Sequence, residues 1–317
     1  MPTTARSHQC NECGRLTDTT RTMRGYAYCE SCYNTRTFVC PECGERFHIC
    51  DREGGMCYRC HERSSVWDAN QKPFDGKTEE LRSARRFGIE LETSACGEYR
   101  KLRGKTVYGA KYDGSISGME FVSPILQGDA GLWATRGFCT RAKHMGFRVN
   151  GDCGYHLHID VSENTDLQRR HIASAYAYTE RFWRRLVNSY RANDCSWCGR
   201  LPWTGETMVT TYNFSRFCDR QNRYMWFNIQ SLERHGTFEI RLHEGTLASK
   251  VICNWVKAHL RFADFVQDMK FRQIADMFNV PERKMWRAVT NTWNDPALRQ
   301  YYRLIARANA GQRARTR

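Results

Sequence analysis

The 317-residue sequence has no run that approaches the ~18 apolar residues a membrane-spanning helix needs. The segment from Met1 to Cys10 also has no apolar stretch of the kind that a secretory signal peptide carries. We therefore expect a cytoplasmic protein that does not act on a membrane.

A glycine-rich Walker loop is also missing, although the chain contains 23 glycines. Such a loop cradles nucleotide phosphates in one large class of ATP-binding proteins. The sequence therefore predicts no phosphate-binding loop of the Walker type.

Acidic residues are in deficit only in the later part of the chain. The formal net charge is +15, and residues 86–317 hold 36 Lys and Arg against 22 Asp and Glu, whereas residues 1–85 hold 13 against 12. No acid occurs from Arg299 onward, so the sequence ends in a basic tail. A solvated tail is the expectation, and a tail that holds an anion is the alternative.

Cysteine, by contrast, is abundant. Nine of the 16 cysteines fall between Cys10 and Cys60. Most of these form Cys-x-x-Cys pairs, which suit a metal better than a disulfide and favour a reducing compartment.

These pairs form an internal repeat. The fragments "CNECGR" and "CPECGE" start 30 residues apart, and "CESC" and "CYRC" start 28 apart. One tight turn can present both sulfurs of a pair, and two such turns complete a tetrahedral Zn²⁺ site without an open position. We expect two structural Zn²⁺ ions in zinc-ribbon-like modules over residues 1–65. The predicted ligands are Cys10, Cys13, Cys29, Cys32, Cys40, Cys43, Cys57 and Cys60.

The pairing of these ligands stays open at this point. Sequential and cross-braced arrangements both suit the spacing, and Cys50, His48 and His61 are spare candidates. Unligated cysteines are the remaining alternative. Residues 66–85 are polar, with Pro and Gly, and are predicted to be a linker.

Four later segments alternate between apolar and polar residues, as strands with one buried face do. They are "RFGIELET", "SGMEFVSP", "GYHLHIDVS" and "GTFEIRLHEGT". In the last segment, Ile240 and Leu242 are expected to pack, whereas Arg241 and His243 face the other way. If the strands lie side by side, one polar face carries Glu90, Glu92, Glu120, His156, His158, Glu239 and Arg241.

Clustered carboxylates repel one another and are costly to bury unless cations neutralise them. Oxygen ligands with one or two imidazoles suit Mg²⁺ or Mn²⁺. Arg241 among these acids indicates a second charge to be held, such as a phosphoryl group. Each motif alone also fits a solvated strand face, but the four together favour a divalent-metal site.

The ordered series "RRFGIELET", "DGSISGMEFVSPIL", "CGYHLHIDVS" and "RYMWFNIQSLERHGTFEIRLHEGT" resembles the motifs of the amidoligase family over about residues 85–270. The resemblance implies a glutamine-synthetase-like α+β fold, with a curved antiparallel sheet and helices on its convex face. The concave face of such a sheet holds ATP and divalent metals. The amidoligase domain is then expected over residues 86–270, with a helical extension over 271–317.

The resemblance also implies roles for single residues. Metal ligands would be Glu90, Glu92, Glu120, Glu239 and His156. His158 would lie near the nucleotide, and Arg241 would hold the transferred phosphoryl group. Arg223 and Asn228 match the family pattern and are expected to position substrate or phosphate.

The implied reaction is ATP-dependent formation of an amide. A carboxylate is a poor electrophile, so ATP first converts it to an acyl phosphate, and an amine then displaces phosphate. Asp113, in "KYDGSIS", is a candidate base for the amine. The zinc modules suggest that the carboxylate or amine belongs to a macromolecule such as a protein, a peptide or a modified nucleic acid.

The remaining segments are mostly helical. Residues 129–144 and 166–190 have helical spacing, and the aromatic stripe of the second is expected to be core. The insert "NDCSWCGRLPWTGETM" is expected to cover the substrate. A third metal site with Cys195, Cys198 and Cys218 is the alternative there, although a fourth ligand is missing. Residues 271–289 also resemble a helix-turn-helix.

Two other functions remain open. A metal-dependent hydrolase or nuclease could use the same Glu and His face, because two metals serve phosphoryl cleavage as well as transfer. A non-catalytic adaptor for nucleic acid or protein is less favoured, since the strands contain no ladder of aromatic and basic residues.

Overall fold

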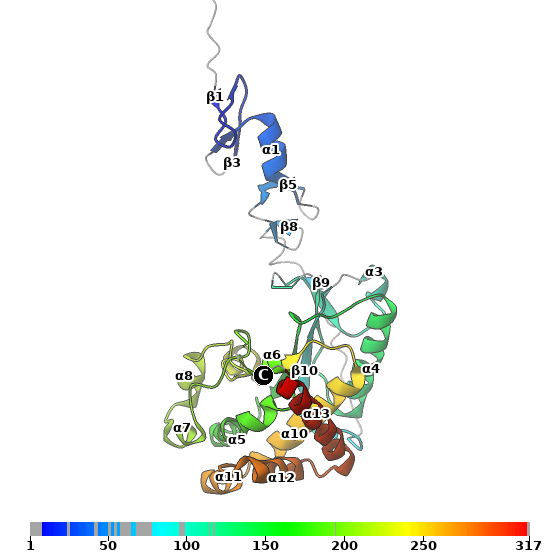
Figure 1. The fold of residues 1–317 in the computed structure, drawn as a ribbon, viewed down its shortest axis with the longest axis vertical. Helices are drawn as coiled ribbons and strands as arrows, with labels where there is room; N and C mark the ends of the chain where they lie inside the picture. The colour runs from blue at the N-terminus through cyan, green and yellow to red at the C-terminus, as the bar shows by residue number, and fades with distance from the viewer. Residues whose placement is uncertain are drawn as a thin grey trace, which may run out of the picture.

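In the computed structural model the fold divides into small amino-terminal sheets and one large body (Figure 1). The structure describes residues 8–23, 26–40, 44–49, 52–53, 56–57, 65–67, 78–94, 99–113, 115–116, 118–193 and 195–315.

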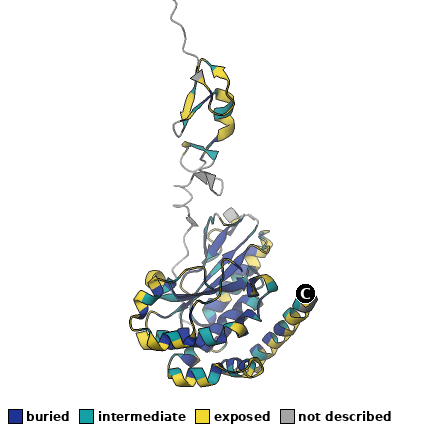
Figure 2. Ribbon diagram, turned by 60° about the vertical axis from the view of Figure 1, so that its left-hand side comes forward, coloured by how far each residue is buried: buried dark blue, intermediate teal, exposed yellow. Residues whose placement is uncertain are grey.

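The described residues of the amino-terminal part form four two-stranded antiparallel sheets and one helix. The paired strands are β1 (His8–Gln9) with β2 (Leu16–Thr17), β3 (Arg21–Met23) with β4 (Tyr26–Tyr28), β5 (Thr37–Val39) with β6 (Arg46–His48), and β7 (Arg52–Glu53) with β8 (Met56–Cys57). Helix α1 (Glu30–Arg36) lies between β4 and β5. Most described residues of this part are exposed or only half-buried, so it has little apolar core of its own (Figure 2).

A seven-stranded antiparallel sheet forms the centre of the large body. Its strand order is β14-β15-β13-β10-β12-β11-β9. The strands are β9 (Ser65–Trp67), β10 (Phe87–Glu92), β11 (Gly109–Lys111), β12 (Glu120–Val122), β13 (Gly154–Asp160), β14 (Phe227–Asn228) and β15 (Thr237–Glu244). The three strands with the longest polar alternation, β10, β13 and β15, are thus neighbours in the sheet.

Long helices pack against the apolar face of this sheet. Leu132, Trp183 and Trp255 of the helices share one continuous core with strand residues such as Leu157 and Ile240. The helices of the large body are α3 (Tyr99–Leu102), α4 (Gly128–His144), α5 (Asp166–Arg184), α6 (Ser189–Ala192), α7 (Gly205–Thr210), α8 (Phe214–Asp219), α9 (Ser231–His235), α10 (Ser249–Val266), α11 (Phe271–Phe278), α12 (Glu282–Thr292) and α13 (Pro296–Arg315).

The expected mixture of helices and an antiparallel sheet is confirmed. Tyr176 and Trp183 of α5 are fully buried, so the aromatic stripe is core as predicted. Thr165 begins this helix with a capping box, in which its hydroxyl accepts from the Gln168 backbone N–H. Among the described residues, no helix combines the length and apolar character that crossing a membrane requires.

The structure differs at both ends from the predicted linker over residues 66–85. Val66 and Trp67 belong to β9, which pairs with β11 at the edge of the large sheet. Leu81 is fully buried in the main core, and its backbone N–H donates to the Asp129 carboxylate of α4 at 2.7 Å. Hydrogen bonding and burial therefore make these ends part of the large body; residues 68–77 lie outside the described ranges.

The predicted helical extension over residues 271–317 is also packed on the large body. Phe278 of α11, Met285 of α12 and Tyr302 of α13 belong to the same apolar core as the sheet. Pro281 lies between α11 and α12, where its ring ends one helix and leads into the next. These helices therefore stabilise the domain that carries the sheet.

Candidate active site

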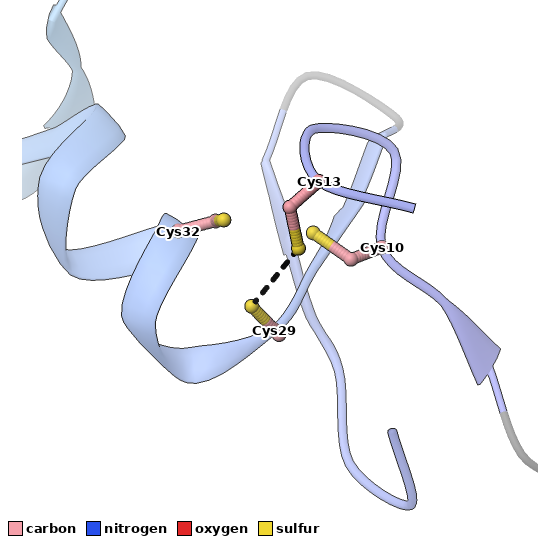
Figure 3. A group of neighbouring side chains, drawn as sticks. All are labelled: Cys10, Cys13, Cys29 and Cys32. Atoms are coloured by element: carbon pink, nitrogen blue, oxygen red, sulfur yellow. Dashed lines mark hydrogen bonds between the residues drawn. The ribbon is translucent and has the colours of Figure 1, made fainter. Parts of the chain in front are cut away.

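The first four cysteines of the repeat lie together. Cys10 and Cys13 flank the turn after β1, Cys29 directly precedes α1, and Cys32 is in its first turn. Their four sulfur atoms all lie within 4.8 Å of one another, and the Cys13 and Cys29 sulfurs are 3.8 Å apart (Figure 3). This is the sequential pairing of the first and second Cys-x-x-Cys motifs. A tetrahedral Zn²⁺ site suits such a group of four thiols.

The thiols of this group differ in pKa: backbone N–H groups favour the thiolate at Cys10, whereas hydrogen bonds with Cys29 and Cys13 raise the pKa of Cys32 to about 12. Backbone N–H groups, with that of Cys13 foremost, lower the pKa of the Cys10 thiol to about 6, against the opposing effect of burial. The second predicted group is only partly described. Cys40 is buried, whereas Cys43, Cys60 and the side chain of Cys57 lie outside the described residues, so that site stays a prediction.

The polar face of the large sheet forms a second candidate site. Its acidic and imidazole side chains line a cavity of about 550 Å³. The sheet order explains this, because β10 pairs with both β12 and β13, and β13 pairs with β15. The strands bring together Glu90, Glu92, Glu120, His156, His158, Glu239 and Arg241.

His156 lies at the centre of the acidic group. Its Nδ1 atom is 3.1 Å from a Glu90 oxygen and 3.4 Å from a Glu239 oxygen, and its Nε2 atom is 3.7 Å from Glu92. Glu92 also accepts the Gly154 backbone N–H at 2.5 Å. The imidazole therefore contacts carboxylates from β10 and β15, which flank its own strand.

Two sets of ligand atoms on this face have the spacing of a metal site. Glu90, Glu120 and His156 form one set, and Glu90, His158 and Glu239 form the other, with ligand atoms within 4.8 Å of one another in each. Glu90 belongs to both. Oxygen-rich sets with one imidazole suit Mg²⁺ or Mn²⁺. Glu92 is in neither set within the described residues, and its assignment as a ligand stays a prediction.

His158 supplies an independent test of whether these residues fit a cation. Its Nδ1 atom lies 3.0 Å from the Thr237 hydroxyl, which holds the ring in place. Its Nε2 atom is buried, and no hydrogen-bond partner lies among the described residues. A buried ring nitrogen without a partner is costly unless something binds it. The residues therefore fit a bound cation.

Burial and the neighbouring charges shift the pKa values of two of the carboxyl groups. Burial would raise the pKa of Glu90, but the hydrogen bond with His156 and the charges of the His158 and His156 imidazoles hold it well below its usual value. Burial and the charge of Glu90 raise the pKa of Glu120 well above its usual value, against the effect of Lys111. The pKa values of the two carboxyl groups are thus shifted in opposite directions, as expected for acids that share a buried site.

Arg241 connects the acidic group to the rest of the cavity. Its Nη1 atom donates to Glu239 at 2.5 Å, and its Nε atom donates to the Trp197 carbonyl at 3.2 Å. Asn228 of β14 donates to the other Glu239 oxygen at 2.7 Å. These bonds fix both the carboxylate and the guanidinium beside the cavity.

The remaining predicted residues also line this cavity. Asp113 follows β11, and its carboxylate accepts from the Ser115 backbone N–H and hydroxyl, both at 2.8 Å. Arg223 precedes β14, and its guanidinium lies 5.3 Å from the centre of the Tyr224 ring. The structure thus gathers these residues around one cavity, while their chemical roles stay predictions.

Sequence reasoning missed several residues that line the cavity. Lys111 is the clearest, because its Nζ atom lies 2.9 Å from Glu120. It is the last residue of β11, a three-residue strand too short for alternation to be recognised. The other missed lining residues are Ser115, Asp152, Tyr190, Arg191, Tyr224, Gln230, Ser231, Arg234 and His235, whereas Trp197 belongs to the insert that was expected to cover the substrate. They come from loops, short helices and strand ends, where no periodic pattern marks a face.

The expectation that His243 shares the polar face with Arg241 is wrong. Its ring packs 4.9 Å from Trp255 and 5.6 Å from Tyr155, both in the core. The pairing of β13 with β15 shifts between Tyr155 and Leu157, so β15 carries an irregularity there. Such a bulge re-aims the side chains that follow it, and it lies beside the site.

The Cys195 and Cys198 pair lies in the loop that borders the cavity. Within the described residues, neither of them nor Cys218 belongs to a group of side chains that could hold a metal ion. The alternative of a third metal site therefore has no support there. Instead, the loop is tied down by Arg184, whose Nη2 atom donates to the Cys198 carbonyl at 3.1 Å.

Comparison with known proteins finds a family model that matches part of this chain. Residues 98–206 match the family described as "Putative amidoligase enzyme". The matched range contains β11, β12 and β13, and hence Glu120, His156 and His158, whereas β10 and β15 lie outside it. The predicted resemblance to amidoligases is thereby confirmed, and it supports an enzyme of the ligase type. No curated protein matches the chain.

Proposed function

We propose that the protein is an ATP-dependent carboxylate–amine ligase that works through an acyl-phosphate intermediate, on a glutamine-synthetase-like sheet. One observation carries the proposal: buried carboxylates and imidazoles from β10, β12, β13 and β15 meet around a single cavity beside Arg241. The match to an amidoligase family over residues 98–206 favours ligation among the reactions that such a face can serve.

The acidic side chains suit a site for metal-bound nucleotide. In this proposal Glu90, Glu120 and His156 hold one Mg²⁺ or Mn²⁺, and Glu90, His158 and Glu239 hold a second. Bound cations would neutralise the phosphate oxygens and so favour transfer of the phosphoryl group. The same carboxylates would repel a nucleotide that carried no metal.

Arg241 is suited to the phosphoryl group that is transferred. Its side chain is 8% exposed and is fixed by Glu239 and by the Trp197 carbonyl. A guanidinium held in one orientation stabilises developing negative charge without reorganising during the reaction. Asn228 keeps Glu239 in position and thereby supports Arg241 through that carboxylate.

The second half of the reaction needs a base for the amine. Asp113 is the candidate, since it lies on a loop at the cavity. This loop follows β11, which three strands separate in the sheet from β15, the strand that carries Glu239 and Arg241. Hydrogen bonds from Ser115 orient one of its oxygens. The carboxylate would accept a proton from the ammonium group, and the neutral nitrogen could then attack the acyl carbon and displace phosphate.

The test is ATP turnover with defined co-substrates. The purified protein is incubated with ATP, Mg²⁺ and a panel of carboxylates and amines, and released phosphate is measured beside the mass of the product. The proposal expects phosphate release that needs both co-substrates, with loss of one water in the mass of the conjugate. Cleavage of nucleic acid or of a phosphoester without any conjugate would instead identify a hydrolase and refute the ligase.

A second proposal concerns the amino-terminal modules, which we propose recruit a macromolecular substrate. Their small size and four-thiol site suit a structural recognition element better than catalysis. Removing the modules should abolish conjugation of a macromolecular substrate. Turnover of small substrates should stay unchanged.

A further inference from the structure

Three aromatic side chains stand at the cavity although they are accessible to solvent. Tyr190 is 54% exposed, Trp197 is 42% exposed and Tyr224 is 37% exposed, and all three line the cavity. By contrast, Trp203 of the same insert is 7% exposed and belongs to the core. Exposed aromatic rings gathered at a polar cavity are typical of a ligand contact.

Trp197 and Tyr224 face each other as an ordered pair. Their ring centres are 5.2 Å apart, at an angle of 77°. The two loops that carry them are joined by backbone hydrogen bonds, from Gly199 N–H to the Tyr224 carbonyl at 2.8 Å and from Trp226 N–H to the Gly199 carbonyl at 2.9 Å. The rings are therefore held in place before any ligand arrives.

Positive charge lies beside these rings. The Arg223 guanidinium is 5.3 Å and the Arg241 guanidinium 6.0 Å from the centre of the Tyr224 ring. Arg241 also joins this aromatic wall to the acidic group, since it binds both the Trp197 carbonyl and Glu239. From the rings to the carboxylates, the cavity thus offers stacking surface, then guanidinium, then sites suited to divalent cations.

We propose that Trp197 and Tyr224 form the subsite for the nucleobase of a nucleoside triphosphate. The order of chemistry along the cavity matches that ligand: a flat ring, then an anionic chain, then the metal-bound end of that chain. Aromatic side chains stack on any base, because every base has a π face. This inference rests on the proposed ATP-dependent function and adds which end of the cavity takes the base.

The test compares binding of Mg-ATP with binding of Mg-tripolyphosphate, which lacks the ring, by titration calorimetry without co-substrates. Trp197→Ala and Tyr224→Ala remove one ring each, and Trp197→Phe keeps a stacking surface. The bond from Arg241 goes to the Trp197 backbone carbonyl, so it survives these changes. Trp133→Ala is the matched control, because Trp133 is 63% exposed on α4 and does not line the cavity.

We expect Trp197→Ala and Tyr224→Ala each to weaken Mg-ATP binding about tenfold or more, the usual scale for loss of base stacking. Binding of Mg-tripolyphosphate should stay unchanged, and Trp197→Phe and Trp133→Ala should bind Mg-ATP nearly as the parent does. Thermal melts should show that all variants remain folded.

Three results would refute the assignment of Trp197 and Tyr224 to the nucleobase while leaving the proposed function intact. One is unchanged Mg-ATP affinity in both alanine variants of a parent protein that binds Mg-ATP. Another is equal weakening of Mg-ATP and Mg-tripolyphosphate. The third is a loss seen only in the KM of the carboxylate or amine, which would assign the rings to that substrate. A parent protein that neither binds nor turns over ATP would refute the proposed function itself.

Discussion

The Nε2 atom of His158 lies 3.6 Å from a Glu90 oxygen, buried and without a hydrogen-bond partner among the described residues. The two residues are on adjacent strands, where Gly88 of β10 is opposite His158 and Glu90 is opposite His156. One carboxylate therefore faces both imidazoles of β13. This relationship makes Glu90 the residue common to both candidate metal sets.

Replacing Glu90 or Glu239 with Gln should lower ATP turnover at least about 100-fold, because each change removes a charge that the proposed cations need. The side chains keep their size, so the fold should persist. Phosphate release and thermal melting measure the two effects. Glu163→Gln is the control, since Glu163 is an 87% exposed carboxylate outside the cavity. Wild-type turnover in both site variants would remove these residues from the mechanism.

Metal stoichiometry should separate the two candidate sets. His158→Ala should weaken one Mn²⁺ site and leave the other, because His158 belongs only to the set with Glu239. Glu120→Gln should affect the opposite site, and Glu90→Gln should weaken both. Titration of Mn²⁺, followed by electron paramagnetic resonance of the free ion, measures each. If all three variants bind Mn²⁺ as the parent does, the sets are not metal sites.

Replacing Asp113 with Asn should slow turnover with an ordinary alkylamine about 10- to 100-fold, the scale of losing a general base. Hydroxylamine is largely unprotonated at neutral pH, so its turnover should fall much less. The ratio of the two rates isolates proton removal from any loss of binding. An equal loss with both nucleophiles would show that Asp113 has another role.

Removal of zinc should affect only the amino-terminal part. Cys10→Ser should lower the bound Zn²⁺ by one equivalent and expose the module to protease, because so short a segment depends on metal for folding. Deletion of residues 1–60, which ends before β9, should leave turnover of small substrates within about twofold, since structural zinc sites contribute to folding and not to chemistry. Zinc analysis and phosphate release test these outcomes. Loss of small-substrate turnover in a folded deletion variant would contradict separate roles.

Local spacing was enough to predict the first cysteine group. Cys10 with Cys13 and Cys29 with Cys32 are each presented by a short segment, so two residues of separation already constrain the sulfurs. Alternation likewise identified the polar face of β10 and β13, because neighbouring strand residues point to opposite sides. The sequence also predicted that the aromatic stripe of α5 is core.

Other features depended on contacts between distant segments. The irregular pairing of β13 with β15 turned His243 toward Trp255, and nothing in its own strand marks that shift. Residues Val66 and Trp67 became an edge strand only through pairing with β11. Likewise, Lys111 joined the site because β11 lies beside β12 and its Glu120.

The spacing of the candidate zinc ligands, the polar residues of the strands and the likeness to amidoligases can all be read from the sequence, because they are properties of short, contiguous segments. The folded chain was needed to show that Trp197 and Tyr224 stand together at the cavity and that Glu90 belongs to two sets of potential metal ligands. Those relationships join loops and strands far apart in the chain, and side-chain packing and backbone hydrogen bonds set their distances.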